Sequence, residues 1–132
     1  MPVCHDDSSV AAFGVTASVA DGTWPADLAL RLTCGSEIES VAFDDLLPSS
    51  MGAFSTATCG FDPRPQWDDA AAIADGAVIR CSWCWDARKG TEGTFEASAT
   101  GYQPVSVALV RPDDDEQGCA QTEDSQVVLS PE

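Results

Sequence analysis

Two cysteines three positions apart are the residues of this sequence best placed to do chemistry. Cys81-Ser82-Trp83-Cys84 has the C-x-x-C spacing of thiol–disulfide oxidoreductases, in which a helix N-terminus lowers the pKa of the first thiol. Here the surrounding residues alternate as in a strand, with Ile79, Cys81, Trp83 and Trp85 on one face and Val78, Arg80, Ser82 and Cys84 on the other. The alternation therefore predicts two structural cysteines on opposite faces, each with its own disulfide partner.

The other cysteines extend this prediction to the whole chain. The six are Cys4, Cys34, Cys59, Cys81, Cys84 and Cys119. An even number in a chain of 132 residues is typical of an oxidising compartment, so we expect a secreted, periplasmic or surface-attached protein. The pairing stays open, although the faces favour Cys81 inward with Cys34 or Cys59, and Cys84 outward with Cys119. Zinc is disfavoured, because Cys34 and Cys59 do not form a second close pair.

Cys4 has two expected roles. The even cysteine count favours an ordinary disulfide. A cysteine followed by the polar residues His5 to Ser9 is also what a lipid-anchored bacterial protein shows after its leader is cut. We expect residues 1–10 to be a flexible segment, which starts a lipoprotein if Cys4 carries lipid, and residues 11–132 to form a single domain.

Catalytic arrangements find little support among the remaining residues. The single histidine is His5, so a Ser-His-Asp or Cys-His site would have to recruit the expected flexible segment. Adjacent carboxylates such as Asp44 with Asp45, or Asp68 with Asp69, lie in expected turns, whereas an acid–base pair needs two environments across a cleft. We assign no catalytic residue and expect no enzyme activity.

The acidic run Asp113-Asp114-Asp115-Glu116 could offer carboxylate oxygens to calcium. It lacks the alternating ligands and the turn glycine of an EF-hand loop. We therefore interpret it as a solvated turn and assign no metal or other cofactor.

Two tryptophans are the candidate ligand-binding residues. Trp24 and Trp67 fall in expected loops, where a large ring either stacks on a ligand such as a sugar or caps the end of the core. Both roles stay open for each of them. Trp83 and Trp85 are expected in the core.

Charge and hydropathy exclude several classes of partner. The chain has 22 acidic and six basic residues, a formal net charge of −16, which argues against binding to nucleic acid or anionic membranes. Its apolar runs are too short for a membrane-spanning helix, and 44% hydrophobic residues are too many for a disordered acidic tail. We expect a monomer whose partner is a protein or a carbohydrate.

Period-two alternation between turn residues predicts an all-β chain. Expected strands span 13–19, 28–34, 39–43, 51–59, 77–85, 94–100, 105–110 and 127–129, of which 39–43 and 51–59 show the weakest pattern. Residues 61–67 are expected to form a loop, 68–76 one or two helical turns, and 77–85 a central strand in a hairpin with 94–100. About seven strands predict an antiparallel two-sheet sandwich of immunoglobulin-like architecture, cross-linked by disulfides.

Two segments carry a family resemblance. One segment runs from Gly93-Thr94-Phe95-Glu96-Ala97 to Gly101-Tyr102-Gln103-Pro104 and a valine-rich strand, and the other is Val19-Ala20-Asp21-Gly22-Thr23-Trp24-Pro25. They resemble the carboxypeptidase regulatory-like domain, a transthyretin-like β-sandwich. The likeness covers under half of the chain, and residues 35–76 depart from it. We expect Gly101 to adopt a positive φ and the Tyr102 hydroxyl to bond backbone.

The resemblance implies a non-catalytic module of secreted or lipid-anchored bacterial surface proteins. We therefore predict an extracytoplasmic binding or structural module of the cell envelope. The alternative is a small secreted calcium-dependent enzyme or an enzyme-inhibitor domain that uses the Asp-rich loops.

Overall fold

The computed structural model describes residues 11–46, 57–65, 73–85, 87–88, 90–112 and 122–132. These residues form eight strands and one short 3-10 helix. They are β1 (Ala11–Val19), β2 (Ala29–Cys34), β3 (Glu37–Ala42), η2 (Phe43–Leu46), β4 (Ala57–Asp62), β5 (Val78–Trp85), β6 (Glu92–Ser98), β7 (Val105–Val110) and β8 (Glu123–Leu129).

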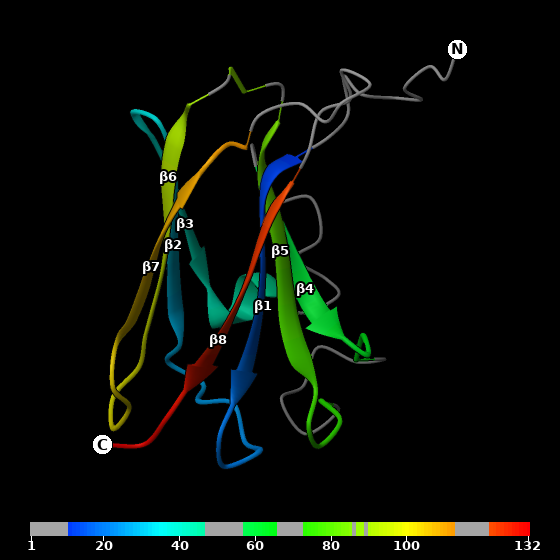
Figure 1. Cartoon of the computed structure of the whole chain (residues 1–132). Helices are drawn as coiled ribbons and strands as arrows, with labels where there is room; N and C mark the ends of the chain where they lie inside the picture. Colours follow the sequence, from blue (N-terminus) through cyan, green and yellow to red (C-terminus); the bar gives the residue numbers. More distant parts are fainter. Residues whose placement is uncertain (1–10, 47–56, 66–72, 86, 89, 113–121) are drawn as a thin grey trace.

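The strands build two facing sheets, so the predicted β-sandwich is confirmed (Figure 1). The first sheet has the order β4-β5-β1-β8, and the second has the order β3-β2-β6-β7. All pairs are antiparallel except β1 with β8, which are parallel. The expectation of a wholly antiparallel sandwich was therefore wrong in this pair. The chain enters β8 from the other sheet, and such a crossover permits parallel pairing where a tight hairpin does not.

Most strands show the predicted alternation of buried and exposed side chains. In β2, Leu30 and Leu32 are buried and Arg31 is exposed. β6 and β7 alternate in the same way, and β5 lies between β4 and β1 as a central strand. β4 continues through Phe61 and Asp62, which were expected in a loop, because the prolines that end the ladder begin only at position 63.

The predicted hairpin between residues 77–85 and 94–100 was wrong. β5 pairs with β1 and β4, whereas β6 pairs with β2 and β7 in the other sheet. Both strands direct aromatic rings into the same core, where the centroids of Trp83 and Phe95 lie 6.2 Å apart. The chain therefore crosses from one sheet to the other after β5, because each strand buries its apolar face against the opposite layer.

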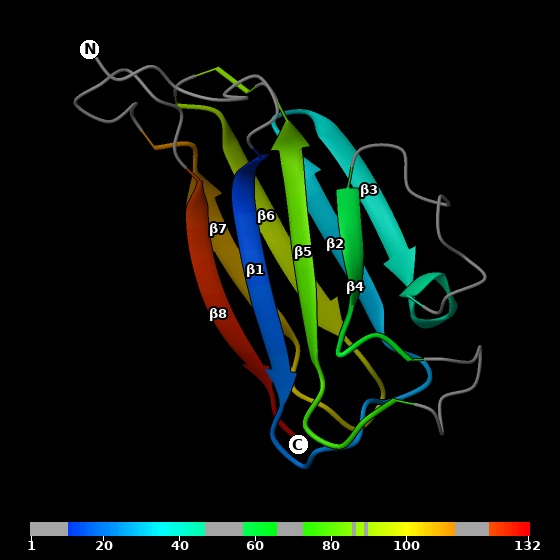
Figure 2. The same cartoon turned by 90° about the vertical axis from the view of Figure 1, so that its right-hand side faces the viewer.

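The core fills the space between the sheets. Its largest fully buried side chains are those of Trp83, Phe13 and Phe95, and no polar or charged residue is buried among the residues the structure describes. At the β3 and β4 edge, η2 packs beside both strands, whereas β7 and β8 lie side by side at the opposite edge (Figure 2).

Several predicted features lie outside the described residues. They are Cys4, Cys119, Trp67, most of the expected helical turns at 68–76, most of the expected strand at 51–59 and the acidic run Asp113 to Glu116. In the described part of the chain, no helix is long and apolar enough to cross a membrane.

Candidate functional site

Four cysteines form two disulfides with different structural roles. Cys34, at the end of β2, bonds Cys84 near the end of β5 and so joins the two sheets. Cys59 bonds Cys81 within the first sheet, where the two are directly opposed on β4 and β5. Cys59 was one of the two partners expected for Cys81. The expected bond between Cys84 and Cys119 was wrong, because Cys84 bonds Cys34.

The backbone of Cys84 explains that error. Cys84 has a φ of 68°, in the left-handed region that non-glycine residues seldom adopt. This breaks the two-residue alternation at the end of β5, so Cys84 turns into the core and is buried. Trp85, which was expected in the core, is 42% exposed for the same reason. The C-x-x-C spacing thus serves two separate structural disulfides.

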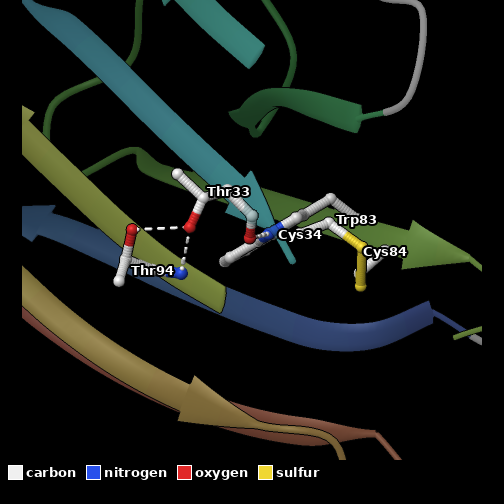
Figure 3. The surroundings of a disulfide bond; sticks show 5 residues. All are labelled: Thr33, Cys34, Trp83, Cys84 and Thr94. Carbon is white, nitrogen blue, oxygen red and sulfur yellow. Dashed lines mark hydrogen bonds between the residues drawn. A yellow bond between two sulfur atoms is a disulfide. The ribbon is translucent and has the colours of Figure 1, made fainter. Parts of the chain in front are cut away.

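Trp83 lies beside the inter-sheet disulfide and ties the same two strands together (Figure 3). Its indole N–H donates to the Thr33 carbonyl oxygen at 2.9 Å, and its ring centroid is 5.5 Å from that of Phe13. The Thr33 hydroxyl also accepts a hydrogen bond from the Thr94 backbone N–H at 2.8 Å and lies 2.8 Å from the Thr94 hydroxyl. This cluster gives the sandwich a cross-linked, hydrogen-bonded centre without a free thiol among the described cysteines.

Two roles were expected for Trp24, stacking on a ligand or capping the core, and the structure places it as a cap of the core. The residue is 8% exposed, its indole N–H donates to the Ala77 carbonyl oxygen at 2.8 Å, and its ring centroid lies 6.1 Å from that of Phe61. A ring buried in this way presents no open face on which a sugar could stack.

The hydroxyl of Tyr102 links two turns at one end of the sandwich. Gly101 has a φ of 83°, as expected, and the half-buried Tyr102 donates its hydroxyl to Asp21 Oδ2 at 2.7 Å, with the Thr23 carbonyl oxygen at 3.3 Å. The hydrogen bond to Asp21 raises the pKa of Tyr102, and desolvation and the negative charge of Asp21 act in the same direction.

Asp27 holds the neighbouring turn. Its carboxylate accepts the backbone N–H of Thr100 at 3.0 Å. Hydrogen bonds from the Thr100 side chain and backbone lower the pKa of Asp27, because they favour its charged form. The turns beside Tyr102 are therefore held by side-chain hydrogen bonds, and this role is structural.

The outer face of the second sheet contains two shallow hollows. One, of about 690 Å³, extends from Asp45 across Arg31 and Glu96 to Ser106. The other, of about 320 Å³, lies beside Glu92 and Ala108. Their floors consist largely of small side chains, so the sheet surface is open there. Arg31 Nε lies 3.9 Å from Glu96 Oε2, a loose ion pair between two half-exposed side chains.

Sequence reasoning missed these hollows because no motif marks them. Glu92, Thr94 and Glu96 do alternate along β6, and this spacing places them on one face of a strand. Which strands lie beside that face depends on the sheet order, which the spacing does not show.

No group of three or more His, Cys, Asp or Glu side chains able to hold a metal ion occurs among the residues that the structure describes.

The fold and the site define a disulfide-cross-linked β-sandwich. The chain matches no protein-family model, no curated protein and no solved structure.

Proposed function

We propose that this chain is a non-catalytic, extracytoplasmic module of the cell envelope, related to the carboxypeptidase regulatory-like domains that parts of its sequence resemble. Its role is to bind another component or to support it mechanically. The observation that carries the proposal is the disulfide between Cys34 and Cys84, which joins the two sheets through the core beside Trp83. Such bonds persist in oxidising compartments and are rare where cellular thiols keep cysteines reduced.

Other features support the same role. The Gly101-Tyr102 corner has the conformation expected from the resemblance, and its hydroxyl bonds Asp21 and the backbone at Thr23. The conspicuous tryptophans Trp24 and Trp83 hold the core together with indole hydrogen bonds to backbone carbonyls. These two tryptophans therefore have structural roles.

Fractionation of the producing cells tests the proposal. We expect the protein in an extracytoplasmic fraction, with non-reducing peptide maps that contain the Cys34–Cys84 and Cys59–Cys81 peptides. The intact mass in the same material separates the two roles expected for Cys4, because a lipid adds mass and a disulfide removes two hydrogens. Recovery from the cytosol with these four thiols reduced would contradict the proposal.

A further inference from the structure

We propose that the edge strand β7 (Val105–Val110) binds an extended, cationic segment of a partner protein, which adds as a further strand to the second sheet. This inference deepens the proposed binding function, on which it rests, by naming the chemistry of the partner. It depends on three features of the described residues: a backbone edge that faces outward, an uncharged strand sequence along it, and carboxylates placed beside it.

The backbone of β7 offers hydrogen bonds on its outer side. The Arg111 N–H donates to the Thr91 carbonyl oxygen at 2.8 Å, in the same register that pairs Val110 with Glu92. Since hydrogen-bonded pairs alternate along an antiparallel ladder, Ser106, Ala108 and Val110 direct their N–H and C=O groups away from β6. The structure shows no hydrogen bond from these three residues to another part of the chain that it describes.

The other three edge strands contain residues that discourage strand addition. β3 contains Glu37 and Glu39, β8 contains Glu123 and Asp124, and β4 contains Gly60 and Asp62. Charged edge residues are a common protection against edge-to-edge pairing. β7 reads Val-Ser-Val-Ala-Leu-Val, without charge, glycine or proline, in a chain with 22 acidic residues. This edge is the one whose sequence suits pairing with another strand.

Carboxylates beside β7 define the charge of the partner. Glu92 and Glu96 lie on the outer face of β6, next to the two hollows, and Glu96 has a loose ion pair with Arg31, whose Nε is 3.9 Å from Glu96 Oε2. They are four residues apart, which is roughly 13 Å along a strand. A strand added to β7 would lie about 10 Å from β6, and Lys or Arg side chains can span this distance across the small Ser106 and Ala108. Cationic residues four positions apart on the partner would face both carboxylates.

The charge of the whole molecule favours the same occupant. A formal net charge of −16 attracts a cationic segment and repels a second copy of this chain. We therefore assign the edge to a cationic partner.

Calorimetric titration of the oxidised 132-residue chain with a designed peptide tests the proposal. The probe is a nine-residue Val/Thr peptide with two Lys four positions apart, compared with the same peptide carrying two Glu. We expect the Lys peptide to bind, the Glu peptide to bind about tenfold more weakly or worse, and added salt to weaken the Lys peptide. Equal binding of both peptides, or no binding of the Lys peptide, overturns the proposal.

Two variants with a matched control locate the binding. Ala108→Pro removes an outward N–H without breaking the ladder to β6, so it should lower the affinity about tenfold. Ile38→Pro in β3, the opposite edge strand of the same sheet, is the control. The Phe43 N–H donates to the Leu28 carbonyl oxygen, and in this register the Ile38 N–H points away from β2. This proline therefore also removes an outward N–H, but at the other edge. It should leave the affinity unchanged.

The double variant Glu92→Gln/Glu96→Gln keeps the proposal testable if Ala108→Pro does not fold. It should lower the affinity for the Lys peptide several-fold and abolish most of its salt dependence. Unchanged affinity in both variants overturns the assignment to β7, as does sedimentation that shows a dimer of this chain which Ala108→Pro dissociates. None of these results changes the expected cellular fraction or disulfide map, so the broader proposed function is tested separately.

Discussion

Close contacts at single residues decide which positions of the sandwich tolerate change. Gly93 in β6 is buried opposite Cys34, and a Cβ atom there would meet the Thr33 carbonyl oxygen and the Phe13 ring, including Phe13 Cδ2 at 2.9 Å. Neither neighbour can yield, since one is backbone and the other is a fully buried ring. Gly60 in β4 has no such neighbour within 4 Å.

Gly93→Ala should therefore destabilise the protein by about 1–3 kcal/mol, the usual cost of overpacking a filled core. Gly60→Ala is the matched control and should change the free energy of unfolding by less than about 1 kcal/mol, because its Cβ enters open space. Urea titration followed by tryptophan fluorescence measures both. Similar losses in the two variants would show that the contacts at Gly93 are not responsible.

The stability of the fold should depend on pH through Tyr102. Its pKa is raised by the hydrogen bond to Asp21, so the folded state holds the phenolic proton more tightly than the unfolded state. The resulting stability is complete below the unfolded pKa of about 10 and is lost as the pH rises through the folded pKa.

The urea midpoint of the wild type should therefore fall between about pH 9 and about pH 11 by more than that of Tyr102→Phe. Because the chain has one tyrosine, phenolate absorbance follows this residue alone. Parallel decreases in the two proteins would contradict the assigned role of the Tyr102–Asp21 hydrogen bond.

At the scale of strands, the two disulfides constrain different lengths of chain. Cys34–Cys84 spans 50 residues and joins two sheets, whereas Cys59–Cys81 spans 22 residues and joins neighbouring strands. Closing the longer loop removes more conformational entropy from the unfolded chain.

Loop-closure entropy predicts that Cys34→Ala/Cys84→Ala costs about 4 kcal/mol and Cys59→Ala/Cys81→Ala about 3.4 kcal/mol. Both variants remove sulfur atoms from the core or its margin, so loop length should set the difference between them. Denaturant unfolding of both double variants measures it. A larger loss from removing Cys59–Cys81 would show that loop length does not govern the ranking.

At the scale of the whole molecule, the dominant property is its negative charge. A net charge of −16 makes carboxylates repel one another in the compact state. Salt weakens this repulsion between exposed charges, so it should stabilise the fold.

An increase in sodium chloride from about 10 to about 150 mM should raise the thermal midpoint of unfolding. Calcium chloride at equal ionic strength should raise it by the same amount. Differential scanning calorimetry makes the comparison. An additional, saturable shift with calcium that chelator reverses would instead favour a metal-dependent site in the Asp-rich loops.

Local patterns were sufficient to predict the strands but not their neighbours. Because side chains alternate faces along any strand, the pattern in β2, β5 and β6 indicates which residues face inward wherever those strands pair. It failed at Cys84, where the positive φ interrupts the alternation. The Gly101-Tyr102 turn was also predictable, because positive φ is a local property of glycine.

By itself, the sequence determined that this protein is a β-sandwich with a buried face on each strand and an acidic surface. These properties follow from side-chain period and composition. The tertiary structure alone decided that β5 and β6 belong to different sheets, that Cys84 meets Cys34, and that the uncharged β7 lies at an edge. Each depends on which distant strands become neighbours, and that is settled by packing two layers around one core rather than by any residue's local preference.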